Sequence, residues 1–286
     1  MGILLCKPGD GVWLTDDAGE YKSRLPCGYE WPCAPCVSPG CAAVCCQKAR
    51  ECLCVERKTS RMLCSMPCAP GICEMLFSFC GRYLYQLSAE ADCVHTCGVA
   101  AGELLYAAPA GVFPRSVRID ETGRYLLCAG GAENKAILFS APDLLQEQTL
   151  RTPHPCFAAD FWQDGLVILC AEEGEDIQTG VYTLAAKAIR MRKLTQLPGP
   201  PGLLRMCPDG KTALVSTRAG LSKLDLYTGG MIWNVPEWAL GMRAECRGNG
   251  ALLSDLPDGN VWLFNHHRPW ERQLVAQAAD SQACFL

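Results

Sequence analysis

The stretch that decides the fold is residues 204–235. It begins LRMCPDGKTALVS at 204–216 and continues with GLSKLDL at 220–226, YTGG at 227–230 and MIWNV at 231–235. Short apolar runs separated by Gly, Pro, Asn and Asp are typical of β-strands joined by tight turns. The stretch therefore predicts a meander of four antiparallel strands, which we call strands A, B, C and D in chain order.

This four-strand unit recurs along the chain. A second copy reads SVRIDETGRYLLC at 116–128 and KAILFS at 135–140. Each copy has a glycine in the turn before strand B, where a tight turn needs a positive φ that glycine adopts at low steric cost. The equivalent glycines are Gly2, Gly40, Gly81, Gly123, Gly165, Gly210 and Gly250. Their spacing of 38 to 45 residues divides the whole chain into seven units.

A period of about 40 residues with four strands per unit is typical of a β-propeller. We therefore predict an all-β chain, one domain over 1–286, with seven blades of four antiparallel strands. The last run, ACFL at 283–286, lacks a following strand B, and the first, GILL at 2–5, lacks a preceding strand A. We expect the two ends to share one blade, because this closes the ring and removes exposed sheet edges. The best helix candidate, 141–148, falls between strands C and D, so an α/β fold is not favoured.

Two short motifs resemble a known repeat family. PDGK at 208–211 and LDLYTG at 224–229 are similar to the repeat of YVTN and lactonase-like propellers. The copy at 114–150 resembles that repeat more loosely, and the first three blades resemble it only in spacing. The resemblance implies the seven-bladed architecture. It also implies one possible activity, that of a lactonase-type hydrolase or isomerase acting on a small sugar-like substrate.

Composition and charge exclude several classes of protein. The 26 Lys and Arg residues nearly balance the 30 Asp and Glu residues, so nothing favours a nucleic-acid partner. No window approaches the 18 apolar residues in succession that a membrane-spanning helix needs. The N-terminal stretch has neither the basic opening nor the long apolar run of an export signal. We therefore expect a cytoplasmic protein with no membrane partner.

The chain has 21 cysteines, of which 14 lie between Cys27 and Cys97. An odd number without an export signal favours reduced thiols over a disulfide scaffold. The position four residues before each turn glycine is occupied by Cys36, Phe77, Ile119, Phe161, Met206, Cys246 and Cys284. Since Phe, Ile and Met fill this position elsewhere, we expect the cysteines to pack as small hydrophobic residues.

A metal site is the alternative interpretation of the cysteines. Cys93, His95 and Cys97 alternate along a predicted strand, so their side chains would share one face. His95 aligns with an isoleucine in another blade, which favours a buried histidine, and we predict no metal and no cofactor. Metal analysis of untagged protein would distinguish the two interpretations.

A functional site is expected at the end of the channel bordered by the D–A and B–C loops, where loops from all blades converge. The candidate ligand-binding residues there are Trp31, Glu90, Arg218 and Trp238, although the two tryptophans are equally compatible with packing between blades. No motif identifies catalytic residues. The candidates are His154, Glu133 and Glu173. We expect the acidic run 172–176 to be a solvated loop, and His266 and His267 to lie on the surface away from this mouth.

These residues leave two main functions open. The first is a non-catalytic binding or scaffold propeller that recognises a protein or a small polar ligand at the loop-lined mouth. The second is the lactonase-type hydrolase or isomerase, which requires His154, Glu133 and Glu173 to converge on one bound molecule. Neither a Gly-x-Ser-x-Gly nor a His-Glu-x-x-His motif occurs, so the sequence favours binding over catalysis.

Overall fold

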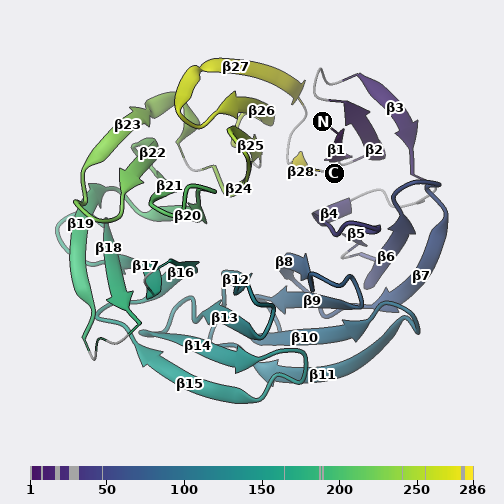
Figure 1. Ribbon diagram of the computed structural model, residues 1–286, viewed down its shortest axis with the longest axis horizontal. Coiled ribbons are helices and arrows are strands. Elements are labelled where there is room, and N and C mark those ends of the chain that lie inside the picture. Colours follow the sequence, from purple (N-terminus) through teal and green to yellow (C-terminus); the bar gives the residue numbers. More distant parts are fainter. Residues whose placement is uncertain are drawn as a thin grey trace.

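The computed structural model is a ring of seven four-stranded antiparallel sheets (Figure 1). It describes residues 2–7, 9–16, 20–25, 32–46, 48–163, 165–186, 188, 190–239, 241–254, 256–277 and 281–285. In every sheet the strands follow the order A, B, C, D from the channel outward, as the repeat predicts. The prediction of an all-β, seven-bladed propeller is confirmed.

The strands of the first four blades have the following bounds. Blade 1 contains β28 (Gln282–Phe285), β1 (Gly2–Lys7), β2 (Gly11–Asp16) and β3 (Tyr21–Arg24). Blade 2 contains β4 (Pro32–Val37), β5 (Cys41–Cys46), β6 (Glu51–Glu56) and β7 (Met62–Pro67). Blade 3 contains β8 (Ile72–Phe77), β9 (Tyr83–Ser88), β10 (Cys93–Gly98) and β11 (Glu103–Pro109). Blade 4 contains β12 (Ser116–Ile119), β13 (Tyr125–Ala129), β14 (Lys135–Ser140) and β15 (Gln146–Arg151).

The other three blades follow the same plan. Blade 5 contains β16 (Cys156–Trp162), β17 (Gly165–Glu172), β18 (Gln178–Ala185) and β19 (Arg192–Pro198). Blade 6 contains β20 (Pro201–Met206), β21 (Thr212–Thr217), β22 (Gly220–Asp225) and β23 (Met231–Val235), and a short 3-10 helix, η1 (Pro236–Trp238), follows it. Blade 7 contains β24 (Arg243–Arg247), β25 (Gly250–Ser254), β26 (Asn260–Asn265) and β27 (Arg268–Gln277).

The two ends of the chain share blade 1, as expected. Strand β28 pairs with β1, with Phe285 opposite Ile3 and Cys284 opposite Leu4. The N and C labels lie together in Figure 1. Ile3, Leu4 and Phe285 are completely buried, so the closing contact is also part of the core.

The core lies between neighbouring blades. Strand β21 is buried along its whole length, whereas most residues of outer strand β11 are exposed. Each apolar cluster joins two adjacent blades, because a blade can cover its faces only with the blades beside it. The segment 141–148 is not a helix: it starts as a turn and its last three residues already belong to β15. Among the described segments, none is a helix long and apolar enough to span a membrane.

The repeat motifs build turns. In the PDGK motif, one carboxylate oxygen of Asp209 accepts the backbone N–H groups of Lys211 and Thr212, at 2.9 Å each. In the LDLYTG motif, Asp225 accepts the backbone N–H groups of Tyr227 and Thr228 in the same way. These side chains satisfy turn donors that have no partner in the sheet. The motif therefore carries information about architecture and none about a ligand.

Only some of the turn glycines adopt the positive φ that the sequence analysis expects. A positive φ is found at Gly81, Gly123, Gly165 and Gly210. Gly40 and Gly250 do not adopt one, and in the last blade Gly248 has the positive φ instead. The glycine spacing marks the blades as predicted. The expectation of a positive φ was wrong at Gly40 and Gly250, because the turns there have a different geometry.

This difference predicts opposite effects of two alanine substitutions. At Gly210, φ is +65° and an added Cβ meets no atom closer than 3.4 Å, so only the backbone conformation opposes a side chain. Gly210→Ala should therefore lower the free energy of unfolding by about 1–2 kcal/mol. At Gly40 nothing lies within 4 Å of an added Cβ and φ is ordinary. Gly40→Ala should be neutral or raise stability by up to about 1 kcal/mol. Urea denaturation of both variants tests this, and equal losses would contradict the turn assignment.

Candidate functional site

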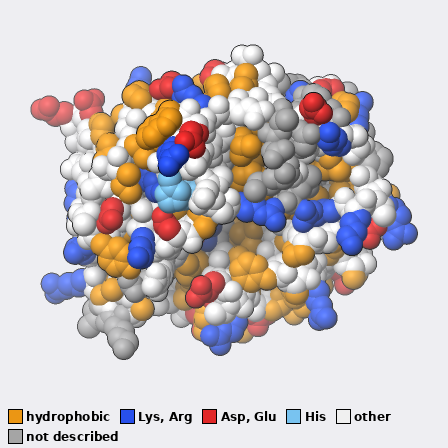
Figure 2. Space-filling model, turned by 45° about the horizontal axis from the view of Figure 1, so that its top comes forward, with side chains coloured by type: hydrophobic (Ala, Val, Ile, Leu, Met, Phe, Trp, Pro, Cys, Tyr) orange, Lys and Arg blue, Asp and Glu red, His pale blue; other side chains and the backbone are white. Residues whose placement is uncertain are grey.

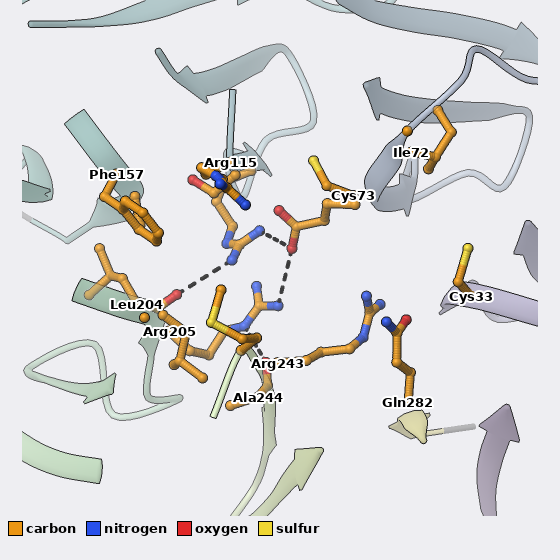
Figure 3. A pocket seen from close by; sticks show the side chains of 18 residues that line it. Cys33, Ile72, Cys73, Arg115, Phe157, Leu204, Arg205, Arg243, Ala244 and Gln282 are labelled. Atoms are coloured by element: carbon orange, nitrogen blue, oxygen red, sulfur yellow. Dashed lines mark hydrogen bonds and ion pairs between the residues drawn. The ribbon is translucent and has the colours of Figure 1, made fainter. Parts of the chain in front are cut away.

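A cavity of about 310 Å³ lies in the central channel, at the end where the D–A loops lead into the inner strands. Its wall is formed by the first residues of the inner strands, including Ile72 of β8, Phe157 of β16 and Gln282 of β28 (Figure 3). In the space-filling view, the centre of the ring is hollowed and Lys and Arg side chains lie beside the hollow (Figure 2). The cavity lies at the mouth that the sequence analysis indicates.

The cavity wall contains far more positive than negative charge. Four arginines and one glutamate line it: Arg115, Arg118, Arg205, Arg243 and Glu74. A second cavity of about 290 Å³ lies on the other side of the same side chains, toward the A–B turns, and Arg118, Arg205, Arg243 and Glu74 line it as well. These four residues therefore form a charged layer across the channel.

Arg118 is at the centre of this layer. Its guanidinium lies 2.5 Å from Glu74 Oε1 of blade 3 and 3.6 Å from Asp160 Oδ2 of blade 5. Arg205 lies 3.7 Å from the same Glu74 oxygen, and its Nε donates a 2.7 Å hydrogen bond to the carbonyl of Ala244. The backbone N–H of Val117 donates to the other Glu74 oxygen. The layer thus connects the inner strands of blades 3, 4, 5, 6 and 7.

The charge states in the layer follow from these contacts. Burial alone would raise the pKa of Glu74, but Arg118, Arg205 and the Val117 N–H outweigh it and lower the pKa. Burial also opposes the charge of Arg118, yet the Glu74 and Asp160 carboxylates raise the pKa of its guanidinium. Burial and the neighbouring Arg118 lower the pKa of Arg205, although an arginine stays charged in proteins. Glu74 is ionised at neutral pH, and so are the arginines around it.

Two of the four cavity arginines, Arg243 and Arg115, make no ion pair with a described carboxylate. Arg243 Nη2 donates to the carbonyl of Pro35, and its guanidinium makes no ion pair with any carboxylate of the described residues. In Figure 3 it lies beside Gln282 and extends toward the cavity. Arg115 is exposed and its guanidinium lies 5.6 Å from the centre of the Phe157 ring. The cavity can therefore accept negative charge from a ligand.

Of the predicted ligand-binding residues, the three that the structure describes do not line this cavity. Trp31 lies outside the described residues. Glu90 and Arg218 are exposed, and Arg218 lines a separate open pocket with Glu175 and Asp176. Trp238 is only 1% exposed and its ring centre lies 4.6 Å from that of Phe264, which matches the packing role that the sequence left open. A role of Glu90 and Arg218 in binding remains a prediction.

Of the predicted catalytic residues, Glu133 has side-chain partners of its own. Glu133 accepts the backbone N–H of Val112 at 2.9 Å and pairs with Lys135 at 2.9 Å. Glu173 is exposed, and His154 is half-buried in the loop between β15 and β16. No hydrogen bond or ion pair in the described part of the chain joins the side chains of Glu133, Glu173 and His154. Their catalytic role remains a prediction.

One residue of the acidic run 172–176 is not solvated, contrary to expectation. Glu172 is 7% exposed, accepts the Tyr182 hydroxyl and pairs with Lys193 at 2.6 Å. Burial opposes its ionisation, but the hydrogen bonds from Lys193 and Tyr182 lower the pKa of Glu172. It lies at the end of β17 and faces β18, whereas residues 173–176 extend beyond the sheet and are exposed.

Cys93, His95 and Cys97 lie on β10, as predicted. Cys93 Sγ lies 3.2 Å from His95 Nε2, while Cys97 is buried in the core between blades 2 and 3. Burial lowers the pKa of His95, which favours its neutral form. Within the described ranges, no three His, Cys, Asp or Glu side chains are grouped so that they could hold a metal ion.

The surface position predicted for His266 is wrong. His266 is buried, its Nε2 donates to the carbonyl of Gly248 at 2.9 Å, and its Nδ1 accepts from Lys223 Nζ at 3.0 Å. The reason is that the β26–β27 turn packs against blade 6, where Lys223 is itself buried and needs an acceptor. The hydrogen bond from Cys246 lowers the pKa of the buried Cys207 to about 5. His267 is exposed, as expected.

The sequence contained a signal for two of the four missed arginines, Arg118 and Arg205. The position five residues before the turn glycine is charged in four consecutive blades, where it holds Arg118, Asp160, Arg205 and Glu245. The neighbouring position, four before the glycine, is apolar throughout. A charged column within an otherwise apolar inner strand indicates side chains that face the channel.

Comparison with known proteins confirms the propeller fold. No protein-family model and no curated protein matches the chain. Among solved structures, hydrazine synthase of Kuenenia stuttgartiensis has a TM-score of 0.74 at 14% identity, over 90% of each chain. The periplasmic gluconolactonase of Pseudomonas aeruginosa has a TM-score of 0.70 at 16% identity, over 100% of this chain and 98% of that one. A functionally unknown protein of Desulfotomaculum acetoxidans has a TM-score of 0.73 at 11% identity, over 99% and 98%. Identities this low establish architecture alone.

Proposed function

We propose that this protein is a binding propeller that holds a small anionic molecule in the cavity at the mouth of its central channel. The observation that carries the proposal is the charge of the cavity, where four arginines face a single glutamate. Carboxylate and phosphate groups match the planar, two-pronged geometry of a guanidinium better than other anions do. The proposed ligand therefore carries one or more of these groups.

The geometry of the cavity supports a small ligand over a protein partner. Its volume of about 310 Å³ is at the lower end of the range usual for ligand pockets. Arg205 and Arg243 extend from the inner strands β20 and β24, which are more rigid than loops. Apolar contact is available from Ile72, Phe157 and Leu204 on the same wall. A ligand of this kind would have a charged end among the arginines and a small apolar part beside Phe157.

Arg243 provides the test because it lines the cavity without an ion pair to any described carboxylate and, unlike Arg115, extends from an inner strand. We expect Arg243→Met to weaken binding of the best anionic ligand about ten- to a hundredfold. This is the effect of losing one hydrogen bond to a charged group. The ligand is first found by a thermal-shift screen of inorganic phosphate, citrate, gluconate and sugar phosphates, and its affinity is then measured by calorimetry. Arg151→Met is the matched control, because Arg151 is exposed on outer strand β15.

Three results would count against the proposal. One is that no anion in the screen raises the melting temperature of the wild-type protein. Another is that Arg243→Met and Arg151→Met bind the same ligand equally well. The third is that the protein converts a lactone or another sugar-like compound, which would favour the lactonase-type hydrolase or isomerase to which the motifs at 208–211 and 224–229 are similar.

The proposal includes a cytoplasmic location. It is supported by the density of cysteines, since a thiol-rich core remains reduced in a compartment held at low potential.

A further inference from the structure

The core between blades 2 and 3 is made largely of sulfur-containing side chains. Cys45, Cys52, Cys54, Cys68 and Cys97 are buried in it, and Met66 and Met75 pack beside them. Cys52 Sγ lies 3.7 Å from Met75 Sδ. Most of these residues fill the volume that leucine and valine fill between other blades, so packing explains them. One pair is closer than packing requires.

Cys45 and Cys68 are that pair. Their sulfur atoms are 3.4 Å apart, although the residues come from strand β5 and from the segment after β7. Both are thiols. A disulfide has a sulfur–sulfur distance of about 2.05 Å, so the two sulfur atoms have to move closer to form one. Cys68 lies outside the regular ladder, which gives it more freedom to move than a residue within a strand.

Cys33 connects this pair to the channel. It lies opposite Cys45 in the register of β4 and β5, and a side-chain hydrogen bond links it to Cys45. Cys33 also lines the cavity that contains the arginines (Figure 3). The three residues therefore form a continuous row from the cavity wall to the buried Cys68.

The electrostatic environment differs along the row. Hydrogen bonds with Cys33 and Cys68 raise the pKa of Cys45, which keeps its proton. The hydrogen bond from Cys45 lowers the pKa of Cys68, and the positive charge of Arg50 contributes in the same direction. The Cys45 thiol thus stabilises the Cys68 thiolate. Once Cys45 is oxidised, the same Cys68 thiolate is placed to attack it. Thiol–disulfide exchange needs such a thiolate as the attacking group.

We propose that Cys33, Cys45 and Cys68 form a thiol relay in which a small organic disulfide entering the channel oxidises Cys45 and Cys68 to a disulfide. Cys33, as its thiolate, attacks one sulfur of the small disulfide and releases the first small thiolate. Cys45 passes its proton to the Cys68 thiolate, whose sulfur is 3.4 Å away, and attacks Cys33 Sγ as a thiolate. This step forms a Cys33–Cys45 bond and releases the second small thiolate. Cys68 then attacks Cys45 Sγ and forms the Cys45–Cys68 bond, and its proton passes to the Cys33 thiolate as that leaves. In balance, two protein thiols lose two electrons and two protons, and one small disulfide becomes two small thiols.

The test uses the reduced full-length chain exposed to oxidised glutathione under anaerobic conditions. After an acid quench, remaining thiols are alkylated and the unreduced digest is mapped by tandem mass spectrometry. We expect a cross-link between Cys45 and Cys68. Cys80, which is exposed, serves as an internal standard for oxidant exposure. The proposal is overturned if Cys80 is modified while both Cys45 and Cys68 remain alkylated.

Variants separate the relay from simple proximity. Cys45→Ala and Cys68→Ala should abolish the cross-link, and Cys33→Ala should slow its formation. Cys128→Ala is the control, because Cys128 is equally buried but belongs to the next interface. An unchanged rate in Cys33→Ala would overturn the relay. If a variant fails to fold, the map of the wild-type chain still decides whether Cys45 and Cys68 become joined.

The relay and the anion site can fail separately. Oxidised glutathione is anionic, whereas cystamine is a cationic disulfide. If the relay and the anion site are both correct, Arg243→Met should slow formation of the cross-link with oxidised glutathione. It should leave the rate with cystamine unchanged or make it faster. A cross-link that forms equally fast with both reagents in the wild-type protein would support the relay and count against the anion site.

Discussion

Replacing Arg118 with Met is expected to lower the free energy of unfolding by about 3–5 kcal/mol, the range for breaking a buried ion pair by removing one partner. The Arg118 side chain is 11% exposed and pairs with Glu74 and Asp160 from two other blades. The substitution keeps most of the apolar volume and removes the charge. Both carboxylates then stay in the channel without their main counterion. Urea denaturation at pH 7 measures the loss.

The loss should depend on pH in a defined direction. In the wild-type protein the pKa of Glu74 is lowered, so its contribution to stability is present above the unfolded value of about 4.3 and is lost as pH falls through the folded value. In Arg118→Met, protonation of Glu74 relieves the penalty of an isolated buried charge. The difference between the two proteins should therefore be largest near neutral pH and become smaller below about pH 4.

Two further variants define what Arg118 contributes. Arg118→Lys keeps the charge but not the planar fork, so its loss should be smaller than that of Arg118→Met. Arg151→Met, on the exposed outer strand, should change stability by no more than about 0.5 kcal/mol. A loss below about 1 kcal/mol for Arg118→Met, or one that does not vary with pH, would mean that water screens the charged layer.

The second large effect is expected at the closure of the ring. Phe285→Ala should lower the free energy of unfolding by about 3–5 kcal/mol, as is typical of a buried aromatic residue. Phe285 is completely buried and packs with Ile3, Leu252 and Val261 across blades 1 and 7. The variant leaves a cavity at the point where the two ends of the chain meet. Because β28 has few residues, the cavity should also weaken the pairing of β28 with β1.

Hydrogen exchange distinguishes the closure effect from a general core defect. Amides of β1 and β28 should lose protection before those of the other blades in Phe285→Ala. Phe113→Ala is the matched control, since that ring is 56% exposed and its loss should cost less than about 0.5 kcal/mol. Uniform loss of protection in all blades would show that the ring opens as a unit and that closure has no separate role.

The sequence predicted the blades well because the information for each blade is local. The run GLSKLDL at 220–226, predicted as strand C, agrees with β22 (Gly220–Asp225) to within one residue. Turn residues such as Asp209 act on backbone groups two or three residues away. Where prediction failed locally, as for the φ of Gly40 and Gly250, different turn geometries satisfy the same spacing.

The candidate site was predicted only in its general position. A cavity lies at the mouth where a site was expected, but the arginines that line it were missed because the search concentrated on loops. Arg118 and Arg205 lie 87 positions apart in sequence, and both contact Glu74, which comes from a third blade. Nothing in any single repeat indicates that these three side chains meet. His266 was misplaced for the same reason, since its partner Lys223 belongs to the neighbouring blade.

The amino-acid sequence by itself determined the number of blades, the strands and turns of each, and the pairing of the two ends. These features depend on periodicity and on contacts over a few residues, which a linear pattern records. Only the tertiary structure decided which charged side chains share the channel, which histidine is buried and which cysteines approach each other. Those outcomes depend on the curvature that brings seven inner strands around one axis, and distance across a ring is not encoded in distance along the chain.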